Sequence, residues 1–558
     1  VEFTFRRGVA EDEAPFVVTG DVASVFPNTD ATVYGTAELL WSAFENPSEL
    51  SLEEYGYGTP DPRVGFLPFD AHFFPRPLER LASLFESSDA PDLVYGVFPY
   101  ASGGVGTHGG MSGLQSRASL ILSGPRVREG AVLDDDAALV DIAPTVLAAL
   151  GAPTTSGRSS THEFEDGLML QAQDGRILRE SLNPVACARP EHAVIIVFDG
   201  LQALEINRQI LAENPEIDLP NFRRLAEAGT IYRYGALSGF PSYSAPGHSS
   251  VGTGVWPGHH GVLGNSYYNR AQQQVFTPFD LITGLTGFIA DPESALDLYR
   301  RLFSGGAENL AQATHRAFGA WNPADQTGAF VAVINELTFL DADFSTLSFL
   351  NGGARTKALP EYRVADGLAM VQIQALMYDS EYPVPKVLLM SFLATDAAGE
   401  SDGPHSPLLR DVVIELDARL GSVLEAYDER GAFDKTLFVL TSDHGMELQD
   451  RTRRARPQIG VRTSFRSAGM VYLRTLEVDV GRGEEAEQLS VAVRNHDNDA
   501  ELPGAEIRCP MCEPDSIETN ELGLATLRVL DPEQPVELEI LHPEFNTQHL
   551  RLQTLGSP

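Results

Sequence analysis

Three apolar runs, widely separated along the chain, each lead into an aspartate. They are residues 192–198 before Asp199, residues 386–393 before Asp396, and residues 436–440 before Asp443. Apolar runs of this length are typical of buried strands. Open α/β sheets gather their ligand-binding groups at the carboxyl ends of the strands. The chain is therefore predicted to form an α/β fold in which these three carboxylates converge.

Helical segments lie between these runs, as expected when helices connect the strands of one sheet. The clearest is residues 408–428, an amphipathic pattern with six apolar side chains on one side. Residues 266–385 carry further helical patterns, among them 294–303 and 308–317, but no evident site chemistry. We interpret residues 266–385 as an inserted cap within a main α/β part that spans residues 191–475.

The character of the chain changes near its end. A chain of 558 residues is too long for one compact core, so more than one domain is expected. Beyond residue 478, short alternating strands are separated by turns, which predicts a small β-sandwich over residues 478–556. This tail resembles transthyretin-like, immunoglobulin-like and carbohydrate-binding modules, and it suits contact with a surface or a carbohydrate. Cys509 and Cys512 within it have CxxC spacing but no second pair, so we expect a local disulfide rather than a zinc site.

The overall charge and hydropathy exclude some functions. The chain has 78 acidic and 40 basic residues, a formal net charge of −38, and a surface this acidic repels nucleic acid polymers. No run of about 18 apolar residues is present, so no membrane span is predicted. The chain begins at Val1 without an initiator methionine. We interpret this as a removed leader and expect a periplasmic or secreted protein.

The first 178 residues contribute one conspicuous candidate. Residues 103–110 form a glycine-dense loop around His108, and glycines let a backbone approach a ligand closely. His108 joins Asp199, Asp396, Asp443 and His444 as a set of carboxylates and imidazoles suited to two divalent metal ions. Any one aspartate after a strand could simply cap a helix. The histidine–glycine pairs at His108 and His444, each near predicted strands, favour metal binding.

A candidate nucleophile lies in residues 240–265. Four serines are present there: Ser242, Ser244, Ser249 and Ser250. Metal coordination activates a serine by stabilising its alkoxide. The residue types alone do not choose among the four.

A resemblance to a known family singles out one of the four serines. Residues 244–248 match the T-x-P-x-H motif of the nucleotide pyrophosphatase/phosphodiesterase and phosphonoacetate hydrolase branch of the alkaline phosphatase superfamily, with serine in place of threonine. Asn265 follows Ser244 by 21 residues, the spacing of the asparagine that binds a phosphate oxygen in that branch. The resemblance implies a three-layer α/β/α sandwich and covers roughly residues 60–170 and 192–450. It makes Ser244 the nucleophile and His248 a support for the loop.

The resemblance also implies how two metal ions are held. One ion would be bound by Asp199, Ser244, Asp443 and His444. The other would be bound by Asp396, by His108, and by the fourth residue after Asp396. Zinc is the metal first expected at both positions.

The order of these parts departs from the family. His108 precedes Asp443 by 335 residues, whereas the family places this histidine after the aspartate–histidine pair. We interpret residues 1–178 as the C-terminal part of the fold moved to the front by circular permutation, with residues 179–190 as the linker. A truncated first copy of a tandem pair is the alternative.

One ligand position also departs from the family, because Glu400 stands where the family has histidine. Four carboxylates and a serine alkoxide would then carry five negative charges against four positive charges from two divalent ions. Such a site favours harder ions, so Mn, Ca or Fe are alternatives to zinc. His405 is the alternative ligand to Glu400.

These features predict a metal-dependent hydrolase of phosphodiester, or related phosphoryl or phosphonate, bonds that acts on a small phosphorylated substrate through a phosphoserine intermediate. A sulfatase is one alternative, although the arginine of the sulfatase signature is replaced here by His248. A phosphomonoesterase is another, although no arginine lies near Ser244 in the sequence to grip a dianion. A catalytically impaired binding protein, with Glu400 as the disabling change, is the third.

Overall fold

The computed structural model describes residues 3–7, 16–20, 75–95, 104–156, 158–159, 167–184, 188–278, 306–346, 359–379, 381–449, 462–467, 469–483, 485 and 487–553, and the structural statements below concern these residues. The chain divides into two compact units. The first comprises residues 1–90, 96–265 and 277–456, and the second comprises residues 91–95, 266–276 and 457–558.

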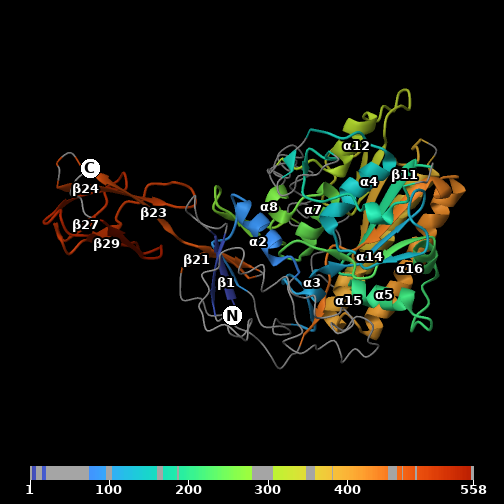
Figure 1. Cartoon of the computed structure of the whole chain (residues 1–558), viewed down its shortest axis with the longest axis horizontal. Helices are drawn as coiled ribbons and strands as arrows, with labels where there is room; N and C mark the ends of the chain where they lie inside the picture. The colour runs from blue at the N-terminus through green and yellow to red at the C-terminus, as the bar shows by residue number, and fades with distance from the viewer. Residues whose placement is uncertain are drawn as a thin grey trace. The chain divides into compact units, whose positions relative to one another are not determined.

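An eight-stranded mixed sheet forms the centre of the first unit (Figure 1). Its order is β17 (Phe344–Thr346), β16 (Val331–Ile334), β18 (Val387–Phe392), β11 (His192–Phe198), β19 (Thr436–Thr441), β6 (Leu120–Ser123), β12 (Gly229–Tyr232) and β7 (Ala131–Leu133). The first five strands are parallel, and β6 runs antiparallel to both of its neighbours. Strands β18, β11 and β19, which the three apolar runs predicted, lie side by side at the centre.

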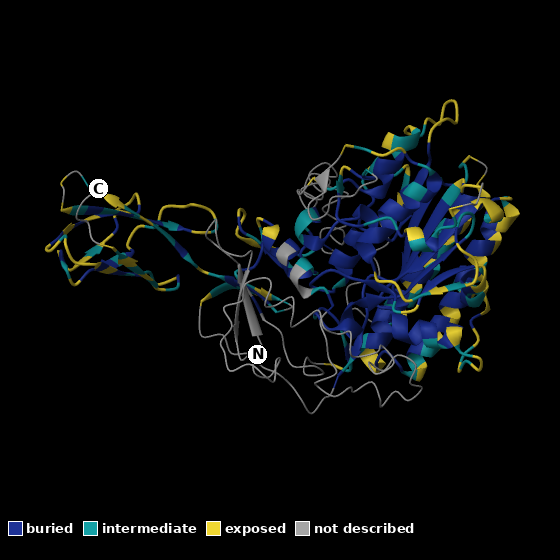
Figure 2. Ribbon diagram, in the orientation of Figure 1, coloured by how far each residue is buried: buried dark blue, intermediate teal, exposed yellow. Residues whose placement is uncertain are grey.

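Helices cover both faces of this sheet (Figure 1). One face carries α4 (Ile142–Leu150), α7 (Ser244–Thr253) and α12 (Leu310–Phe318). The other carries α5 (Ala203–Leu211), α14 (Leu359–Tyr378), α15 (Ala394–Asp402) and α16 (Pro407–Glu429). Since each strand of the central trio has helices above and below it, its side chains are almost all buried (Figure 2). The predicted α/β class is confirmed.

Helix α16 shows how the sequence sets these elements. Ser406 caps its first turn by accepting a hydrogen bond from the Leu409 backbone N–H at 3.1 Å, and Pro407 occupies the first helical position. The six apolar residues that defined its predicted face are all buried: Leu409, Val412, Val413, Leu416, Leu420 and Val423. This face packs against α14 and α15 and fixes the layer below the sheet.

The segment expected as an inserted cap differs from that expectation. Residues 331–334 and 344–346, inside 266–385, form β16 and β17 of the central sheet. All four residues of β16 are buried, so this short apolar run is a sheet strand. Residues 266–276 belong to the second unit. The helix expected at 308–317 is α12, and the one expected at 294–303 lies outside the described residues.

The N-terminal segment contributes strands β6 and β7 to the central sheet of the first unit. Its strand β6 pairs with β19 on one side and β12 on the other. Its strand β4 (Gly106–Thr107) pairs with β20 (Glu447–Leu448). Of the expected linker, residues 179–181 form a short 3-10 helix, and residues 185–187 lie outside the description.

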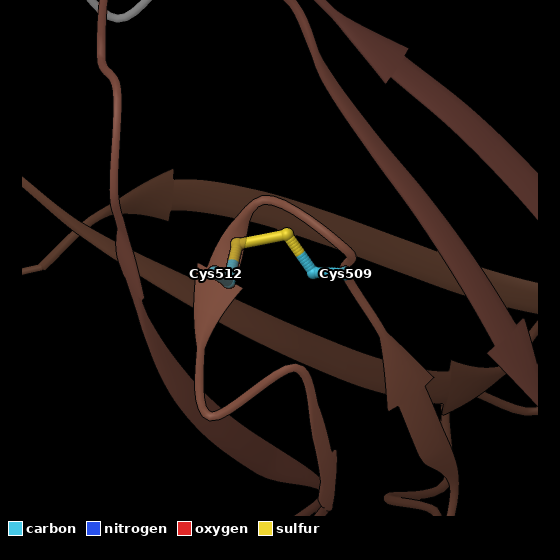
Figure 3. Close-up of a disulfide and its surroundings, with 2 residues drawn as sticks. All are labelled: Cys509 and Cys512. Atoms are coloured by element: carbon cyan, nitrogen blue, oxygen red, sulfur yellow. A yellow bond between two sulfur atoms is a disulfide. The ribbon is translucent and has the colours of Figure 1, made fainter.

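The second unit contains two four-stranded antiparallel sheets. One has the order β23 (Leu476–Arg482), β24 (Gln488–Asn495), β28 (Leu524–Val529), β26 (Cys512–Glu513), and the other β27 (Ser516–Glu518), β25 (Glu506–Arg508), β29 (Val536–Leu541), β30 (Gln548–Leu552). Val491 of the first sheet and Ile507 and Ile540 of the second share one buried core, so the sheets form a sandwich. The disulfide predicted at Cys509–Cys512 is present (Figure 3).

In the described part of the chain, none of the helices combines the length and the apolar character needed to cross a membrane.

Candidate active site

The three aspartates meet at one edge of the central sheet. The register pairs Phe198 with Phe392 and Val197 with Thr441, so the strands before Asp199, Asp396 and Asp443 end together. Hydrogen bonds between side chains and backbone groups then tie the loops to one another. The Gly200 N–H donates to Asp443 Oδ1 at 2.9 Å, and the Thr395 hydroxyl donates to the Asp199 carbonyl at 2.5 Å.

Gly200 has a structural reason for being glycine. Its φ is +70°, and a Cβ at this position would lie 3.0 Å from the Asp396 Cα. A larger residue would carry a strained backbone and would push the strand ends apart. The turn after β11 therefore sets the distance between Asp199 and Asp396.

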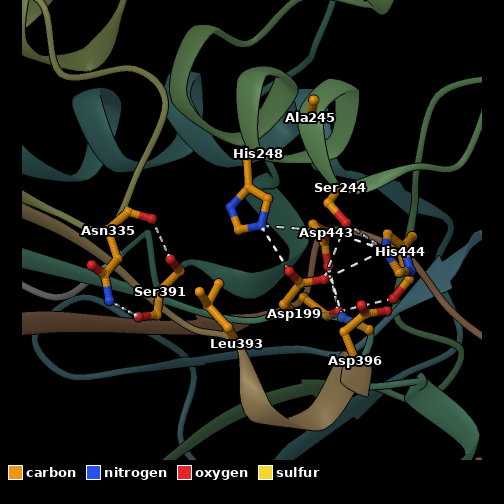
Figure 4. A network of polar contacts seen from close by, with 12 residues as sticks. Asp199, Ser244, Ala245, His248, Asn335, Ser391, Leu393, Asp396, Asp443 and His444 are labelled. Carbon is orange, nitrogen blue, oxygen red and sulfur yellow. Dashed lines mark hydrogen bonds and ion pairs between the residues drawn. The ribbon is translucent and has the colours of Figure 1, made fainter. Parts of the chain in front are cut away.

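Ser244 stands over these carboxylates at the first position of α7. Its Oγ lies 3.4 Å from Asp199 Oδ1 and 3.3 Å from His444 Nε2 (Figure 4). His444 Nε2 lies 3.2 Å from Asp443 Oδ2 and 3.5 Å from Asp199 Oδ1. The four side chains that the family resemblance assigns to one metal ion therefore form one connected cluster, with His444 in contact with the other three.

The other three serines have structural partners. Ser242 Oγ donates to the Gly110 carbonyl, and Ser249 Oγ donates to the Ala245 carbonyl, each at 2.7 Å. Ser250 Oγ lies 3.2 Å from His260 Nε2. Of the four serines, Ser244 is the one placed next to the carboxylates, with its Oγ beside Asp199.

Asn265 lies beside the backbone that follows Ser244. Its Oδ1 accepts a hydrogen bond from the Ala245 N–H at 2.8 Å. This bond fixes the amide of Asn265 next to the first turn of α7, where a helix N-terminus attracts anions.

His108 reaches the same edge from the N-terminal segment. Its Nε2 lies 3.4 Å from Asp396 Oδ1 and 3.3 Å from Glu400 Oε1. Its ring stacks on that of His444, with centroids 3.8 Å apart. The glycine-rich loop can approach because a Cβ on Gly106 would lie 2.1 Å from the Gly399 carbonyl oxygen. Here glycine is needed for close packing on α15.

Glu400 and His405 are the two alternatives for one ligand position, and their side chains contact different residues. Glu400 faces His108, and its side chain is 36% exposed. His405 Nδ1 contacts Glu205 Oε2 at 2.8 Å and is buried. Arg410 Nε donates to the same Glu205 carboxylate at 3.0 Å. In this structure the carboxylate of Glu400, not the imidazole of His405, is next to His108.

Burial and neighbouring charged groups shift the pKa values of the residues in the site. Burial, Asp443 and Asp396 raise the pKa of Asp199 well above its ordinary value. Burial also opposes ionisation of Asp443, but His444 and His248 outweigh it and lower the Asp443 pKa to about 2. Burial lowers the pKa of His108, yet Asp396 and Glu400 raise it to about 9. So many acidic groups in one buried place require a compensating positive charge.

The donor set fits metal ions. Two groups of ligand atoms lie within metal-binding distance of one another: His108, Asp396 and His444 in one, and Asp199, His248 and Asp443 in the other. Asp443 Oδ2 is buried and accepts no hydrogen bond from the described residues. Carboxylates with imidazoles are ordinary ligands for divalent transition metals.

Sequence reasoning missed Glu336 and assigned His248 only the role of supporting the loop. His248 Nε2 lies 3.7 Å from Asp199 Oδ2 and 3.6 Å from Asp443 Oδ2. Its Nδ1 contacts Glu336 Oε1 at 2.9 Å. Glu336 follows the apolar strand Val331–Ile334 by two residues, with Asn335 between them, and so carries a similar signal, an acid just after a strand, to the one that identified the three aspartates.

A sheet edge that presents carboxylates and imidazoles around a serine is the arrangement expected of a metallohydrolase. The family model described as type I phosphodiesterase / nucleotide pyrophosphatase matches residues 193–501, more than half of the chain. The chain belongs to this family, the branch that the residues around Ser244 indicated.

Two curated relatives illustrate the extent of the similarity. Ectonucleotide pyrophosphatase/phosphodiesterase family member 7 of Homo sapiens is 24% identical over 237 residues, 42% of this chain and 45% of the relative. An uncharacterized pyrophosphatase/phosphodiesterase of Schizosaccharomyces pombe is 24% identical over 255 residues, 45% of this chain and 44% of the relative. The chain thus spans about half the length of the curated relatives it matches.

Solved structures of related enzymes are more distant. Murine ectonucleotide pyrophosphatase / phosphodiesterase 5 is 14% identical, with a TM-score of 0.32, and the match covers 55% of this chain and 66% of the other. Phosphonoacetate hydrolase from Sinorhizobium meliloti 1021 is 18% identical, with a TM-score of 0.30, and the match covers 46% and 57%.

Proposed function

We propose that the protein is a metal-dependent hydrolase of phosphodiester, or related phosphoryl or phosphonate, bonds in small substrates. The observation that carries this proposal is the position of Ser244 Oγ, 3.4 Å from Asp199 and 3.3 Å from His444 in a buried cluster of acids and imidazoles. Membership of the type I phosphodiesterase family supports the reaction class.

Two divalent ions would complete the site. Asp199, Ser244, Asp443 and His444 would hold one of them. Asp396, His108 and Glu400 would hold the other. The contact of Glu400 with His108, and the pairing of His405 with Glu205, support Glu400 in that role. When bound, the ions supply the positive charge that activates the serine hydroxyl and stabilises the leaving oxygen. We propose zinc first, with Mn, Ca or Fe as alternatives because of Glu400.

The chain's own residues perform the remaining tasks. Ser244 Oγ forms a bond to phosphorus in line as the bond from phosphorus to the leaving group breaks. The serine hydroxyl gives up its proton, the leaving group takes up one from water, and a phosphoserine and the free leaving group result. The Nδ2 amide of Asn265 donates a hydrogen bond to a non-bridging oxygen, where charge accumulates in the transition state, while its Oδ1 accepts from the Ala245 N–H. Water then attacks the phosphoserine and releases Ser244.

We also propose that the domain is circularly permuted. In support, β6 of the N-terminal segment pairs with β19 and β12 inside the central sheet. His108 of the same segment contacts Asp396 and Glu400. The family model begins only at residue 193, so these contributions come from outside the matched region.

The setting of the protein is a further part of the proposal. We place it in the periplasm or outside the cell, which the Cys509–Cys512 disulfide supports, since such bonds persist in oxidising compartments. The β-sandwich would contact a surface or a carbohydrate.

The test compares the wild-type protein with Ser244→Ala on bis-p-nitrophenyl phosphate. Loss of the nucleophile should lower the rate by at least about 10³-fold. Ser250→Ala is the matched control, since that hydroxyl contacts His260 and not the carboxylates. The p-nitrophenyl monoester and sulfate identify the reaction class. Faster sulfate or monoester turnover would overturn the diesterase proposal, and no serine-dependent turnover of any of the three would overturn the enzyme.

A further inference from the structure

Helix α7 carries a second functional side chain one turn after Ser244. His248 extends from α7 toward Asp199 and Asp443 (Figure 4). Its Nε2 lies 3.7 Å from Asp199 Oδ2 and 3.6 Å from Asp443 Oδ2. These oxygens differ from Asp199 Oδ1, which faces Ser244, and from Asp443 Oδ1, which accepts the Gly200 N–H. The imidazole therefore contacts the side of both carboxylates that Ser244 does not occupy.

The other ring nitrogen of His248 is held by a buried acid. His248 Nδ1–H donates to Glu336 Oε1 at 2.9 Å, and the side chains of His248 and Glu336 are 3% and 0% exposed. Glu336 stands just beyond the end of β16, two positions along the sheet from β11. A rigid strand end thus fixes the plane of the imidazole.

Two glycines of α7 allow this arrangement. A Cβ on Gly247 would lie 2.3 Å from the Asp443 carbonyl oxygen, and one on Gly252 would lie 2.0 Å from Thr338 Oγ1. The helix is therefore packed directly against the loop that carries Asp443 and the segment that carries Glu336. Side chains larger than glycine at these two positions would move His248 away from both.

We propose that Glu336 is a positioning residue that acts through His248 to hold Asp199 and Asp443 in the orientation needed for metal binding. Carboxylate–imidazole pairs next to a metal commonly orient the groups they touch, and their loss costs about 10–100-fold in metal affinity. The proposal rests on the proposed function, because Asp199 and Asp443 are taken as ligands of one ion. It adds two side chains to the four that the family resemblance assigns there.

The experiment uses Co²⁺ as the probe and reads metal binding, not turnover. Wild-type protein, Glu336→Ala and Glu336→Gln are stripped of metal and titrated with Co²⁺, and the visible absorption of the bound ion is recorded. Glu336→Ala should weaken one of two bound ions by about 10–100-fold and shift its absorption bands. Glu336→Gln keeps an oxygen that can accept from His248 Nδ1–H, so it should restore most of the affinity.

Asp417→Asn is the matched control. Asp417 is also a buried carboxylate, but it accepts the Phe222 N–H at 2.9 Å at the start of α6 (Pro220–Glu227). Its substitution should lower the unfolding temperature and leave Co²⁺ affinity and absorption unchanged.

Three results would overturn the proposal. If Glu336→Ala bound Co²⁺ with the affinity and absorption of the wild-type protein, Glu336 would have only a structural role. Complete loss of one ion in His248→Ala, with full binding in Glu336→Ala, would make His248 itself a ligand. No Co²⁺ binding by the wild-type protein would refute the metal site, and with it the proposed function, whereas the first two results leave that function standing.

Discussion

The two halves of the candidate site are built in different ways. Asp199, Asp443 and His444 follow two neighbouring strands, and their side chains are 7%, 0% and 0% exposed. All three lie inside the region that the family model matches. The other half combines Asp396 with His108, which lies outside that region, and with Glu400, whose side chain is 36% exposed.

This difference shows which part of the site depends on the rest of the fold. The first half follows from strand pairing alone, because β11 and β19 are adjacent and in register. The second half requires that a loop more than 280 residues from Asp396 pack against α15, where Gly106 meets Gly399. The first half is therefore expected to survive changes that destroy the second.

The largest effect that tests this contrast is expected from His108→Ala. Removal of the imidazole should abolish binding of one divalent ion and leave the other bound. The lost Lewis acid stabilises the transition state by several kcal/mol, which corresponds to a fall of roughly 10²–10³-fold in diesterase rate. Metal content after dialysis, measured by elemental analysis, checks the first point, and kcat/KM checks the second.

His315→Gln provides the control for this change. His315 contacts Asp343 at 2.9 Å, away from the carboxylate cluster, and its substitution should change neither metal content nor rate. If His108→Ala lost both ions together, the two halves would form one cooperative site and the contrast would be wrong.

A smaller effect is expected from Glu400→His. This change gives the second half the donor set of the family and removes one negative charge. Imidazole suits zinc better than it suits manganese, so the ratio of Zn²⁺ to Mn²⁺ affinity should rise by about tenfold at one of two sites. Competition titrations with the two metals measure that ratio.

Glu415→His makes the same chemical change on an exposed helix position, where Glu415 pairs with Arg363. It should leave the ratio unchanged. An unaltered ratio in Glu400→His as well would mean that Glu400 is not a ligand, although it faces His108.

The sequence predicted the three aspartates at the strand ends better than it predicted the rest of the domain. An apolar run followed by an aspartate is a local signal, and it located Asp199, Asp396 and Asp443 together with their strands. The similar signal at Glu336 is weaker, because its strand lies among the helical patterns of residues 266–385 and Asn335 separates it from the strand. Buried strand β16 is only four residues long, and its place in the sheet depends on pairing with β18, which no local pattern encodes.

The choice between Glu400 and His405 shows a second limit of sequence reasoning. Both residues follow Asp396 closely, and an imidazole is the family's ligand. The structure turns His405 toward the buried carboxylate of Glu205, which also accepts a hydrogen bond from Arg410. That pairing depends on how α5 packs against the start of α16, which a reading of residues 394–407 cannot reveal.

The smallest expected effect concerns a charged cluster away from the site, which joins the N-terminal segment to the region that the family model matches. His259 Nδ1 lies 2.5 Å from Asp174 Oδ2, and its Nε2 lies 2.6 Å from Glu86 Oε2. Burial lowers the pKa of His259, but Asp174 and Glu86 raise it to about 9, above the ordinary value of 6.5.

Since the folded state binds this proton more tightly than the unfolded state, the charged imidazole stabilises the fold fully below pH 6.5. The contribution is lost as the pH rises from 6.5 through about 9. Glu86 is half exposed, so screening limits the contribution to about 1 kcal/mol, or about 1 °C in the Tm of a unit this large. The Tm of the wild-type protein should therefore exceed that of His259→Gln at pH 6, and the two should converge at pH 10. A constant difference across this range would show that the imidazole packs between the segments without its charge contributing to their attachment.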